Sequence, residues 1–401
     1  MNTLFKNYVN TFRGLSTEVW WLSLITFINR SGTMVIPFLS LYLTKSLNFS
    51  LSDVGWIMSF FGLGSVVGTW IGGKLTDIIG YYKVMLVSLF GTGILFVFLQ
   101  FASTFNQFCF GIFTVMLIAD AFRPAMFVAL NAYSKPENKT RSVTLIRLAI
   151  NLGFSAGPAV GGLIITAVGY AGLFWTDGIT CVLAAILLLQ VLNPKKVKVV
   201  EKVKLENPVS VYKDKAFLIF FVAMFIFGFV FMQYFSTIPL YYNENRLLSE
   251  FNIGLLMGLS GLIIFLLEMP LIKWLEDLKK SKIKLIALGL FYVGISFIIL
   301  NLTGWVGILI IGILLMSLGE MIAFPFSNSF AVERSEKGNQ GEYMALYSIS
   351  FSLAHIFSHN VGMQMVNKFG FETTWIAITV FALIGVLILV YLLNVLKREV
   401  V

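Results

Sequence analysis

The sequence predicts an all-α membrane protein in which twelve transmembrane helices form two pseudo-symmetric six-helix bundles. Of its 401 residues, 58% are hydrophobic and only 12% are charged, whereas soluble domains carry roughly 25% charged residues. Predominantly apolar runs of about 20 residues, enough for a helix to cross the hydrocarbon layer, recur from one end of the chain to the other. A soluble fold cannot bury that much apolar surface, so we expect a polytopic membrane protein.

The first six spans are expected in the N-terminal half. A short segment with Lys6 and Arg13 leads into the first apolar run, which we expect to act as an uncleaved insertion signal. Turn residues and charges then separate each apolar run from the next. They place the spans at residues 18–46, 52–76, 84–103, 106–133, 140–167 and 171–192.

A long polar segment, "NPKKVKVVEKVKLENPVSVYKDK" (193–215), separates these spans from six more. Its lysines predict a basic linker that lies against anionic headgroups. The later spans are expected at residues 216–243, 252–273, 283–302, 305–333, 342–367 and 371–396. The predicted domains are therefore an N-terminal bundle at 1–192, a linker at 193–215 and a C-terminal bundle at 216–401.

Most of the 29 lysines and arginines lie in the linker, at the chain ends and in loops on the same side of the membrane. Because such residues concentrate in cytoplasmic loops, both termini are predicted to be cytoplasmic. The net charge of +9 comes from these short loops and not from a basic domain, which argues against a nucleic-acid partner. Cys109 and Cys181 lie within apolar spans and predict no disulfide framework.

The two halves show signs of a duplication. "TMVIPF" (33–38) aligns with "FSTIPL" (235–240), and "FRPAMF" (122–127) aligns with "AFPFSN" (323–328), which places Pro124 over Pro325. These prolines lie in the first or fourth span of each half, where an interrupted backbone can line a cavity. Two repeated halves around a central site are typical of a transporter.

The junction of spans 2 and 3 carries a recognisable motif. "GKLTDIIGYYK" (73–83) resembles the G-x-L-a-D-r-x-G-r-[rk] signature of the major facilitator superfamily, through Gly73, Leu75, Asp77, Gly80 and Lys83. Ile78 and Tyr81 depart from it. Glycines allow a tight loop, and an aspartate can cap or bridge to the other half, so the resemblance implies a cytoplasmic gate. A polar turn that only sets topology is the alternative.

Span 5 contains "GFSAGPAVGG" (153–162), which resembles the motif of twelve-helix drug/proton antiporters within this superfamily. Glycines four residues apart make a face for close helix packing, and proline removes a backbone hydrogen bond. The resemblance implies a gating role for Gly153, Gly157, Pro158 and Gly161. A packing face without such a role is the alternative.

Charged residues inside spans are costly and are functional candidates by default. In the superfamily fold, spans 1, 4, 7 and 10 line the cavity, so the resemblance implies a substrate site with Asn29, Arg30, Arg123 and Glu320. Burial disfavours an ionised carboxyl and a nearby arginine favours it, which makes Glu320 and Asp120 the candidates for proton coupling. Salt bridges or helix-to-helix hydrogen bonds are the alternatives for both carboxyls, and Arg30 could merely neutralise Asp120.

Other intramembrane residues have several possible roles. Arg147 and Glu268 lie toward the cytoplasmic ends of spans 5 and 8, where they could form gate contacts, bridge helices or reach the interface. His355 and His359 are four residues apart, but no third ligand accompanies them, so we predict no metal site. His355 could bind substrate or relay a proton, or both histidines could simply pack. Among many aromatic residues, Tyr234 is a candidate to line an apolar pocket.

The sequence holds no phosphate-binding P-loop, nucleophile elbow or zinc signature, so neither ATP-driven transport nor an enzyme is expected. We predict a secondary transporter that exports amphipathic or aromatic small molecules in exchange for protons, by alternating access. Arg30 stands where many exporters of cationic drugs have a carboxylate, which leaves zwitterionic, anionic or lipid-like substrates open. The alternatives are proton-coupled uptake of peptides or other organic solutes and a lipid or lysolipid flippase, although "TFINRSG" (26–32) lacks the E-x-x-E-R signature of peptide symporters. We expect no cofactor beyond the proton gradient, and a monomer in the cell (inner) membrane.

Overall fold

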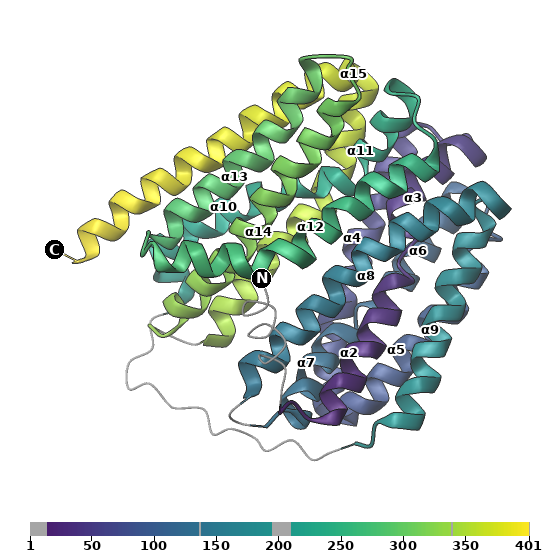
Figure 1. Cartoon of the computed structure of the whole chain (residues 1–401), viewed down its shortest axis with the longest axis horizontal. Helices are drawn as coiled ribbons and strands as arrows, with labels where there is room; N and C mark the ends of the chain where they lie inside the picture. The colour runs from purple at the N-terminus through teal and green to yellow at the C-terminus, as the bar shows by residue number, and fades with distance from the viewer. Residues whose placement is uncertain (1–13, 136–137, 195–209, 338–339, 401) are drawn as a thin grey trace, which may run out of the picture. The chain divides into compact units, whose positions relative to one another are not determined.

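A computed structural model describes residues 14–135, 138–194, 210–337 and 340–400 (Figure 1). Within these ranges every regular element is a helix. Eleven helical stretches among the described residues are long and apolar enough to cross a membrane. The all-α class that the composition predicts is therefore confirmed.

In the N-terminal half, the helices follow the predicted spans to within a few residues. Span 1 consists of α2 (Thr17–Ser31), α3 (Val35–Leu41) and a π-helical turn, η1 (Tyr42–Ser46). Span 4 consists of α6 (Phe105–Ala119) and α7 (Phe122–Tyr133). The other spans are single helices: α4 (Leu51–Ile79), α5 (Tyr81–Leu99), α8 (Lys139–Val168) and α9 (Ala171–Val191).

The C-terminal half repeats this pattern after a short 3₁₀ turn, η3 (Val211–Lys213). Span 7 is again composite, and it contains α10 (Lys215–Met232), the 3₁₀ turn η4 (Gln233–Phe235), α11 (Thr237–Leu240) and the π-helical turn η5 (Tyr241–Asn245). The remaining elements are α12 (Glu250–Asp277), α13 (Lys282–Ile298) with η6 (Ile299–Asn301), α14 (Gly307–Ser335) and α15 (Gln340–Val400).

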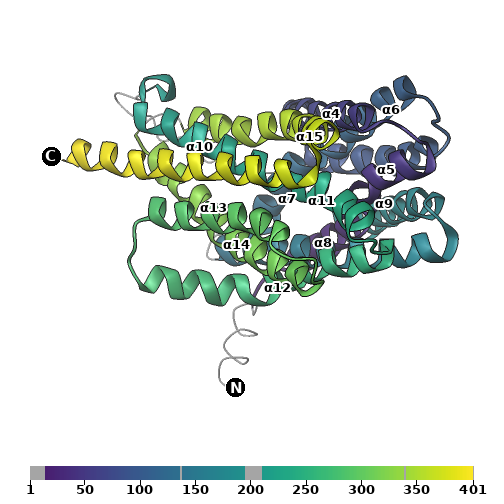
Figure 2. The same cartoon turned by 90° about the horizontal axis from the view of Figure 1, so that it is seen from above.

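The last helix, α15, is too long to be one span. Its 61 residues would extend about 90 Å if straight, roughly three times the hydrocarbon thickness. Gly370 interrupts it with φ 76° and ψ 174°, a conformation that glycine adopts without strain. Figure 2 shows α15 as two segments that run in opposite directions. The sequence predicted a boundary between two spans at this point.

Proline explains where the composite spans are interrupted. A proline ring clashes with the carbonyl four residues earlier and cannot donate a hydrogen bond to it. Counting back four residues from Pro37, Pro124 and Pro239 leads to the breaks at residues 32–34, 120–121 and 233–236. Pro325, by contrast, lies inside the continuous helix α14. The predicted backbone interruption is therefore present in spans 1, 4 and 7 and is absent from span 10.

The described residues divide into two compact units. The first unit falls within Met1–Ile36 and Leu63–Glu201, and the second within Pro37–Gly62 and Lys202–Val401. The segment from Pro37 to Gly62 thus packs with the C-terminal half of the chain. The predicted domain bounds at 1–192, 193–215 and 216–401 stay a prediction, and residues 195–209 of the linker lie outside the described residues.

Glycines bring α4 and α6 into close contact within the first unit. Gly64, Gly68 and Gly72 follow one another at four-residue intervals on one face of α4. A Cβ atom at any of them would overlap the backbone of α6, at Phe113, Leu117 or the adjoining Ala121. Small residues in this pattern let two membrane helices pack backbone to backbone. This packing places Ser65 of α4 beside the break in span 4.

The second unit has an aromatic core between α10, α14 and α15. The ring of Phe324 lies 4.8 Å from that of Phe227 and 5.4 Å from that of Phe351. The first pair is edge-on and the second is stacked, and both arrangements add to the free energy gained by burying the rings. Farther along the unit, Trp375 of α15 is fully buried against Phe297 of α13, with 5.3 Å between ring centroids.

The motif at residues 73–83 lies mostly within helices, which corrects the predicted loop. Helix α4 continues to Ile79 and α5 begins at Tyr81, so Gly73 and Asp77 belong to the last turns of α4. Gly80 alone makes the turn between these two helices, with φ 87°. Residues with a Cβ atom are strained at this φ, whereas glycine is not. The Asp77 and Lys83 side chains are exposed, and the gating role of these four residues stays a prediction.

Candidate functional site

The charged residues predicted for spans 1 and 4 gather at the interruptions of these spans in the first unit. Arg30 lies in the last turn of α2, and Asp120 is the first residue after α6. Arg30 is within electrostatic range of both Asp120 and Arg123. These three residues therefore belong to one charged group, which we call the Arg30 cluster.

Within the Arg30 cluster, Asp120 accepts a hydrogen bond and Arg30 lies against an aromatic ring, whereas a salt bridge is the alternative role considered for Asp120. Asp120 accepts a hydrogen bond from the hydroxyl of Ser65, and the Arg30 guanidinium lies 5.7 Å from the ring centroid of Phe154. Among the described residues, neither Arg30 nor Arg123 forms a salt bridge with Asp120. The buried Nε of Arg30 has no hydrogen-bond partner there. A donor in this state can bind an incoming acceptor at little cost.

The glycine face of α8 packs against the end of α2. A Cβ atom at Gly153 would lie 2.6 Å from the Cβ of Arg30, and one at Gly157 would lie 3.2 Å from the Ser31 carbonyl oxygen. These glycines thus let α8 approach the backbone beside the break in span 1. Helix α8 continues through Pro158. The gating role predicted for Gly153, Gly157, Pro158 and Gly161 stays a prediction.

Asp177, a residue that the sequence analysis does not single out, hydrogen-bonds to the backbone at the break in span 1. The Asp177 carboxylate of α9 accepts hydrogen bonds from the backbone N–H groups of Met34 and Val35, each at 2.9 Å. Gly32 is also required here, because a Cβ atom would overlap the side chain of Thr180. The signal was available in the sequence, since Asp177 is the only acidic residue of the span at 171–191.

Two other predicted residues of the first unit lie near this region. Asn29 donates a hydrogen bond to the Cys181 sulfur at 3.7 Å, which ties α2 to α9. Arg147 is half-buried in α8, one turn before Asn151. The substrate role of Asn29 and the gating role of Arg147 stay predictions.

Glu320, Tyr234 and Glu268 belong to the second unit. Glu320 is half-buried in the middle of α14, and Glu268 is buried in α12. Tyr234 is 5% exposed and donates a hydrogen bond to the hydroxyl of Ser296 at 2.7 Å. The structure thus gives Tyr234 a packing role, and the roles predicted for the three residues in transport stay predictions.

The histidine pair lies between α15 and the part of α4 that belongs to the second unit. The ring centroids of His355 and His359 are 5.8 Å apart. The ring centroid of Phe61 lies 5.9 Å from that of His355 and 6.2 Å from that of His359. Both ring nitrogens of the buried His359 lack a hydrogen-bond partner among the described residues. No group of three metal-ligating side chains occurs in the described ranges. A substrate role for His355 stays a prediction.

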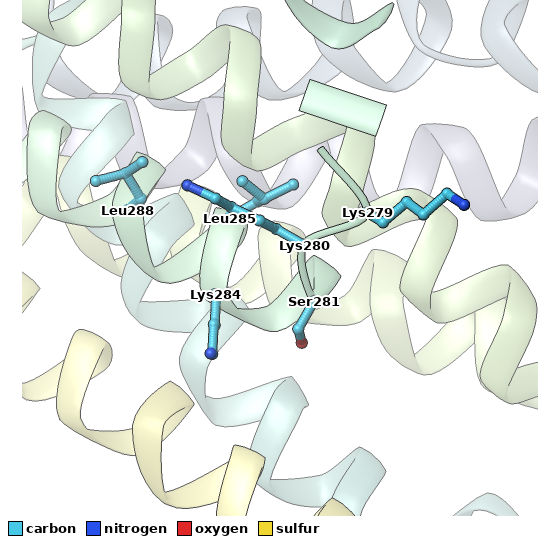
Figure 3. Close-up of a pocket in the computed structure, with 6 residues that line it drawn as sticks. All are labelled: Lys279, Lys280, Ser281, Lys284, Leu285 and Leu288. Carbon is cyan, nitrogen blue, oxygen red and sulfur yellow. The ribbon is translucent and has the colours of Figure 1, made fainter. Parts of the chain in front are cut away.

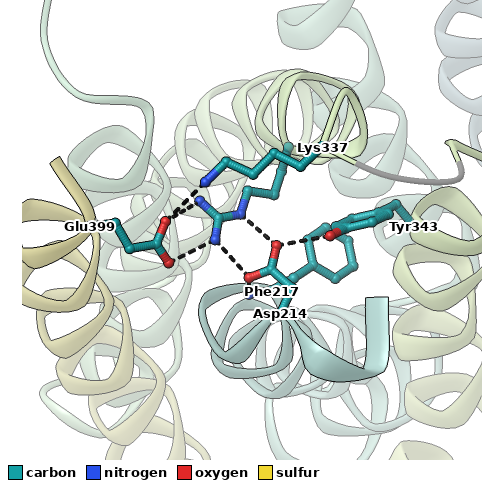
Figure 4. Close-up of polar contacts among 6 residues, drawn as sticks. Asp214, Phe217, Lys337, Tyr343 and Glu399 are labelled. Atoms are coloured by element: carbon teal, nitrogen blue, oxygen red, sulfur yellow. Dashed lines mark hydrogen bonds and ion pairs between the residues drawn. The ribbon is translucent and has the colours of Figure 1, made fainter. Parts of the chain in front are cut away.

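A salt-bridge network that the sequence did not predict lies at the end of α14 (Figure 4). Arg334 donates two hydrogen bonds of 2.7 Å to Asp214 and two, of 2.6 and 2.8 Å, to Glu399. Tyr343 donates to Asp214 at 3.0 Å and Lys337 to Glu399 at 3.1 Å. We call these five residues the Arg334 cluster.

The Arg334 cluster holds Asp214 in its ionised form. Burial opposes the charge, but the hydrogen bonds from Arg334, the Phe217 N–H and Tyr343, together with the charge of Arg334, lower the pKa of Asp214 below its ordinary value. Asp214 also caps α10 through the bond from Phe217, at 3.1 Å. The cluster therefore joins the start of α10 to the ends of α14 and α15.

A surface hollow of about 530 Å³ between α12 and α13 is lined by Lys279, Lys280, Ser281, Lys284, Leu285 and Leu288. Figure 3 shows the lysine side chains pointing in different directions. Their amines do not converge on one point, and none of the predicted site residues lies there. The hollow therefore has no part in the candidate site.

Comparisons with known proteins agree with these features. The family model described as Major Facilitator Superfamily matches residues 19–359. The chain is 26% identical to an uncharacterised MFS-type transporter, YqjV of Bacillus subtilis, over 88% of this chain and 87% of that protein. It is 22% identical to a Na⁺, Li⁺, K⁺/H⁺ antiporter of Planococcus maritimus (90% and 91% covered) and 24% identical to the chloramphenicol resistance protein CraA of Acinetobacter baumannii (84% and 83% covered).

Solved structures show the same fold. A POT family transporter in complex with 5-aminolevulinic acid superposes with a TM-score of 0.78 at 17% identity, covering 95% of this chain and 96% of that one. The nucleoside transporter NupG gives 0.74 at 13% identity, with 94% and 99% covered. The family match makes the protein a multi-pass transporter and not an enzyme, and the solved structures agree with it in fold. The chain belongs to the major facilitator superfamily.

Proposed function

We propose that the protein exports amphipathic or aromatic small molecules in exchange for protons, by alternating access. The Arg30 cluster carries this proposal, because it combines a carboxyl that can bind a proton with a half-buried arginine whose Nε has no hydrogen-bond partner among the described residues. Relatives that are named as a cation/proton antiporter and as a chloramphenicol resistance protein support exchange and export.

The proposed topology has twelve spans with both termini in the cytoplasm. It follows from the distribution of lysine and arginine and from counting the two segments of α15 separately. We further propose that the protein works as a monomer in the cell (inner) membrane and needs no cofactor other than the proton gradient.

In this mechanism, protons and substrate compete for the charged residues. Arg30 binds an anionic or hydrogen-bond-accepting group of the substrate, and Phe154 beside it supplies an apolar contact. Asp120 and Glu320 take up protons when the site opens to the side of higher proton concentration. Protonation of Asp120 removes the negative charge near Arg30 and changes its affinity for substrate.

The test is transport by the purified protein in proteoliposomes with an imposed pH gradient, over cationic, zwitterionic and anionic amphipathic substrates. We expect substrate to move against the direction of proton flow. Asp120→Asn and Glu320→Gln should each bind substrate but lose the dependence on the pH gradient. Glu336→Gln is the matched control, because Glu336 is an exposed carboxylate after the end of α14. Gradient dependence that survives both substitutions would exclude these residues as proton carriers.

Exchange of monovalent cations for protons is the second candidate function, favoured by the relative from Planococcus maritimus. The same vesicles distinguish the two functions. Proton release on addition of Na⁺, Li⁺ or K⁺, without any organic substrate, would favour cation exchange. Movement of substrate in the same direction as protons would instead support symport and would overturn export.

A further inference from the structure

Asp177 is not among the residues of the proposed function, although it is a buried carboxyl that contacts the backbone of span 1. Its side chain is fully buried. Both carboxylate oxygens lie 2.9 Å from the Met34 nitrogen, and Oδ2 also lies 2.9 Å from the Val35 nitrogen. The break in span 1 leaves these N–H groups without partners in a helix. The carboxylate therefore satisfies the interrupted backbone of span 1.

No lysine, arginine or histidine of the described ranges forms an ion pair with Asp177. Among the described residues, the two backbone N–H groups are its only hydrogen-bond partners, and it forms no salt bridge. Cys181, one turn farther along α9, is the ionisable group that interacts with it electrostatically. On α2, Arg30 faces Cys181, Asp120 and Arg123, and Glu18 lies in the first turn of that helix.

The other helices around Asp177 contribute no charge at its level. α9 packs against α2, α5 and α8. The ionisable side chains of α5 lie in its first turn, at Tyr81–Lys83, about 15 Å along the helix from Gly93, which meets Gly178 beside Asp177. Helix α8 has no ionisable side chain after Arg147. The carboxylate is thus held by backbone dipoles alone.

The two N–H donors favour the ionised form of Asp177. An ionised carboxylate accepts at both oxygens, whereas a protonated one carries a hydrogen on one of them. A proton on Oδ2 would compete with both N–H groups, and a proton on Oδ1 would leave them only the uncharged Oδ2, which accepts more weakly than a carboxylate oxygen. Proton binding therefore weakens the hydrogen bonds that hold the backbone of span 1.

The second half of the chain shows that the break itself does not require a carboxylate. The alignment of "TMVIPF" with "FSTIPL" carries Asp177 onto Thr379, which donates to the carbonyl oxygens of Gly294 and Trp375. The break in span 7 is supported by neutral groups: Gln233 donates to the Ser358 carbonyl at 2.8 Å and accepts from Thr237 at 3.0 Å. An ionisable group at this point is therefore particular to the first half.

We propose that Asp177 is a further proton-binding site, in addition to Asp120 and Glu320, and that its protonation weakens the hydrogen bonds from the Met34 and Val35 N–H groups, so that they can be released and span 1 can change shape at its break. Arg30 lies four residues before Met34, so the release moves the residue to which we assign substrate binding. A group that binds protons differently in two conformations makes their equilibrium depend on pH. The effect on transport rests on the proposed function, whereas the effect on the backbone does not.

The direct test is hydrogen–deuterium exchange of the purified protein as a function of pH, with rates corrected for the intrinsic pH dependence of exchange. In the wild type, the Met34 and Val35 amides should be protected at high pH, and their corrected rates should rise by about tenfold or more as the pH falls. Asp177→Asn, which mimics the neutral carboxyl, should show the fast rates at every pH. Asp53→Asn is the control, because Asp53 is a half-buried carboxylate that accepts from Ser50 at the start of α4.

Corrected rates in the wild type that do not change with pH would overturn the proposal, and this measurement needs no variant to fold. A pH-dependent change that persists in Asp177→Asn would overturn it as well. Transport assays separate this inference from the proposed function. If no proton-driven transport is found but the pH-dependent exchange is, the proposed function fails and the proton site at Asp177 stands.

Discussion

Replacing Arg334 by alanine should destabilise the second unit strongly. Asp214 and Arg334 are both buried, with 3% and 9% of their side chains exposed, and two hydrogen bonds of 2.7 Å join them. Removing one partner of a buried pair leaves the other charge without compensation, which costs about 3–5 kcal/mol. Asp214 keeps its bonds from Phe217 and Tyr343, so we expect about 3 kcal/mol, the lower end of this range.

The contact with Glu399 that Arg334→Ala also removes should add little to the loss of stability. Glu399 is 33% exposed and keeps its bond from Lys337, so solvent screens much of its charge. Arg334→Lys should recover only part of the stability, because an ammonium cannot reproduce the two parallel hydrogen bonds of a guanidinium.

Thermal denaturation of the purified protein in detergent measures this effect. The control is Lys282→Ala, which removes a salt bridge of 2.7 Å to Glu333 whose partners are 36% and 63% exposed. Exposed pairs contribute about 0–1 kcal/mol, so the apparent midpoint should fall by several degrees for Arg334→Ala and little for Lys282→Ala. Equal falls for the two variants would refute the argument from burial.

Three further predictions concern stability. Gly68→Ala should cost about 1–3 kcal/mol, because its Cβ would overlap the backbone of α6; Gly73→Ala on the same helix meets nothing within 4 Å and should leave the melting temperature unchanged. Folding lowers the pKa of Asp214, so its ionised carboxylate contributes its full share of the folding free energy above the unfolded pKa of about 3.9, and this share is lost as the pH falls through the folded pKa. The difference in stability between wild type and Asp214→Asn should therefore shrink in acid. A difference that stays constant with pH would contradict this. Tyr234→Phe loses the bond to Ser296 and should lower stability by about 1 kcal/mol, as chemical denaturation would measure.

The bounds of the spans could be predicted because they depend on local properties. The length of an apolar run and the charges at its ends decide where a helix enters and leaves the bilayer, and the helices end within a few residues of the predicted positions. The interruption of spans 1, 4 and 7 is local as well, since each proline acts on the carbonyl four residues before it. The continuous helix at Pro325 marks the limit of that rule.

The partners of the charged residues could not be predicted, because they come from distant parts of the chain. The sequence left a salt bridge and a helix-to-helix hydrogen bond open as alternatives for Asp120, and the approach of α4 to α6 brings the hydroxyl of Ser65 to it. Arg334 directly follows the predicted span at 305–333, where the sequence indicates only a loop charge, but Asp214 at the start of α10 and Glu399 near the end of α15 both form salt bridges with it.

The sequence by itself determined a membrane protein of long apolar helices, the places where three of them are interrupted, and a superfamily motif at their junctions. Only the tertiary structure decided that Asp177 closes one interruption, that glycines of α4 and α8 set how closely helices approach, and that Arg334 is buried. Hydrophobicity acts on each segment separately, whereas a hydrogen bond or a close backbone contact exists only once two segments have been brought within a few ångströms of each other.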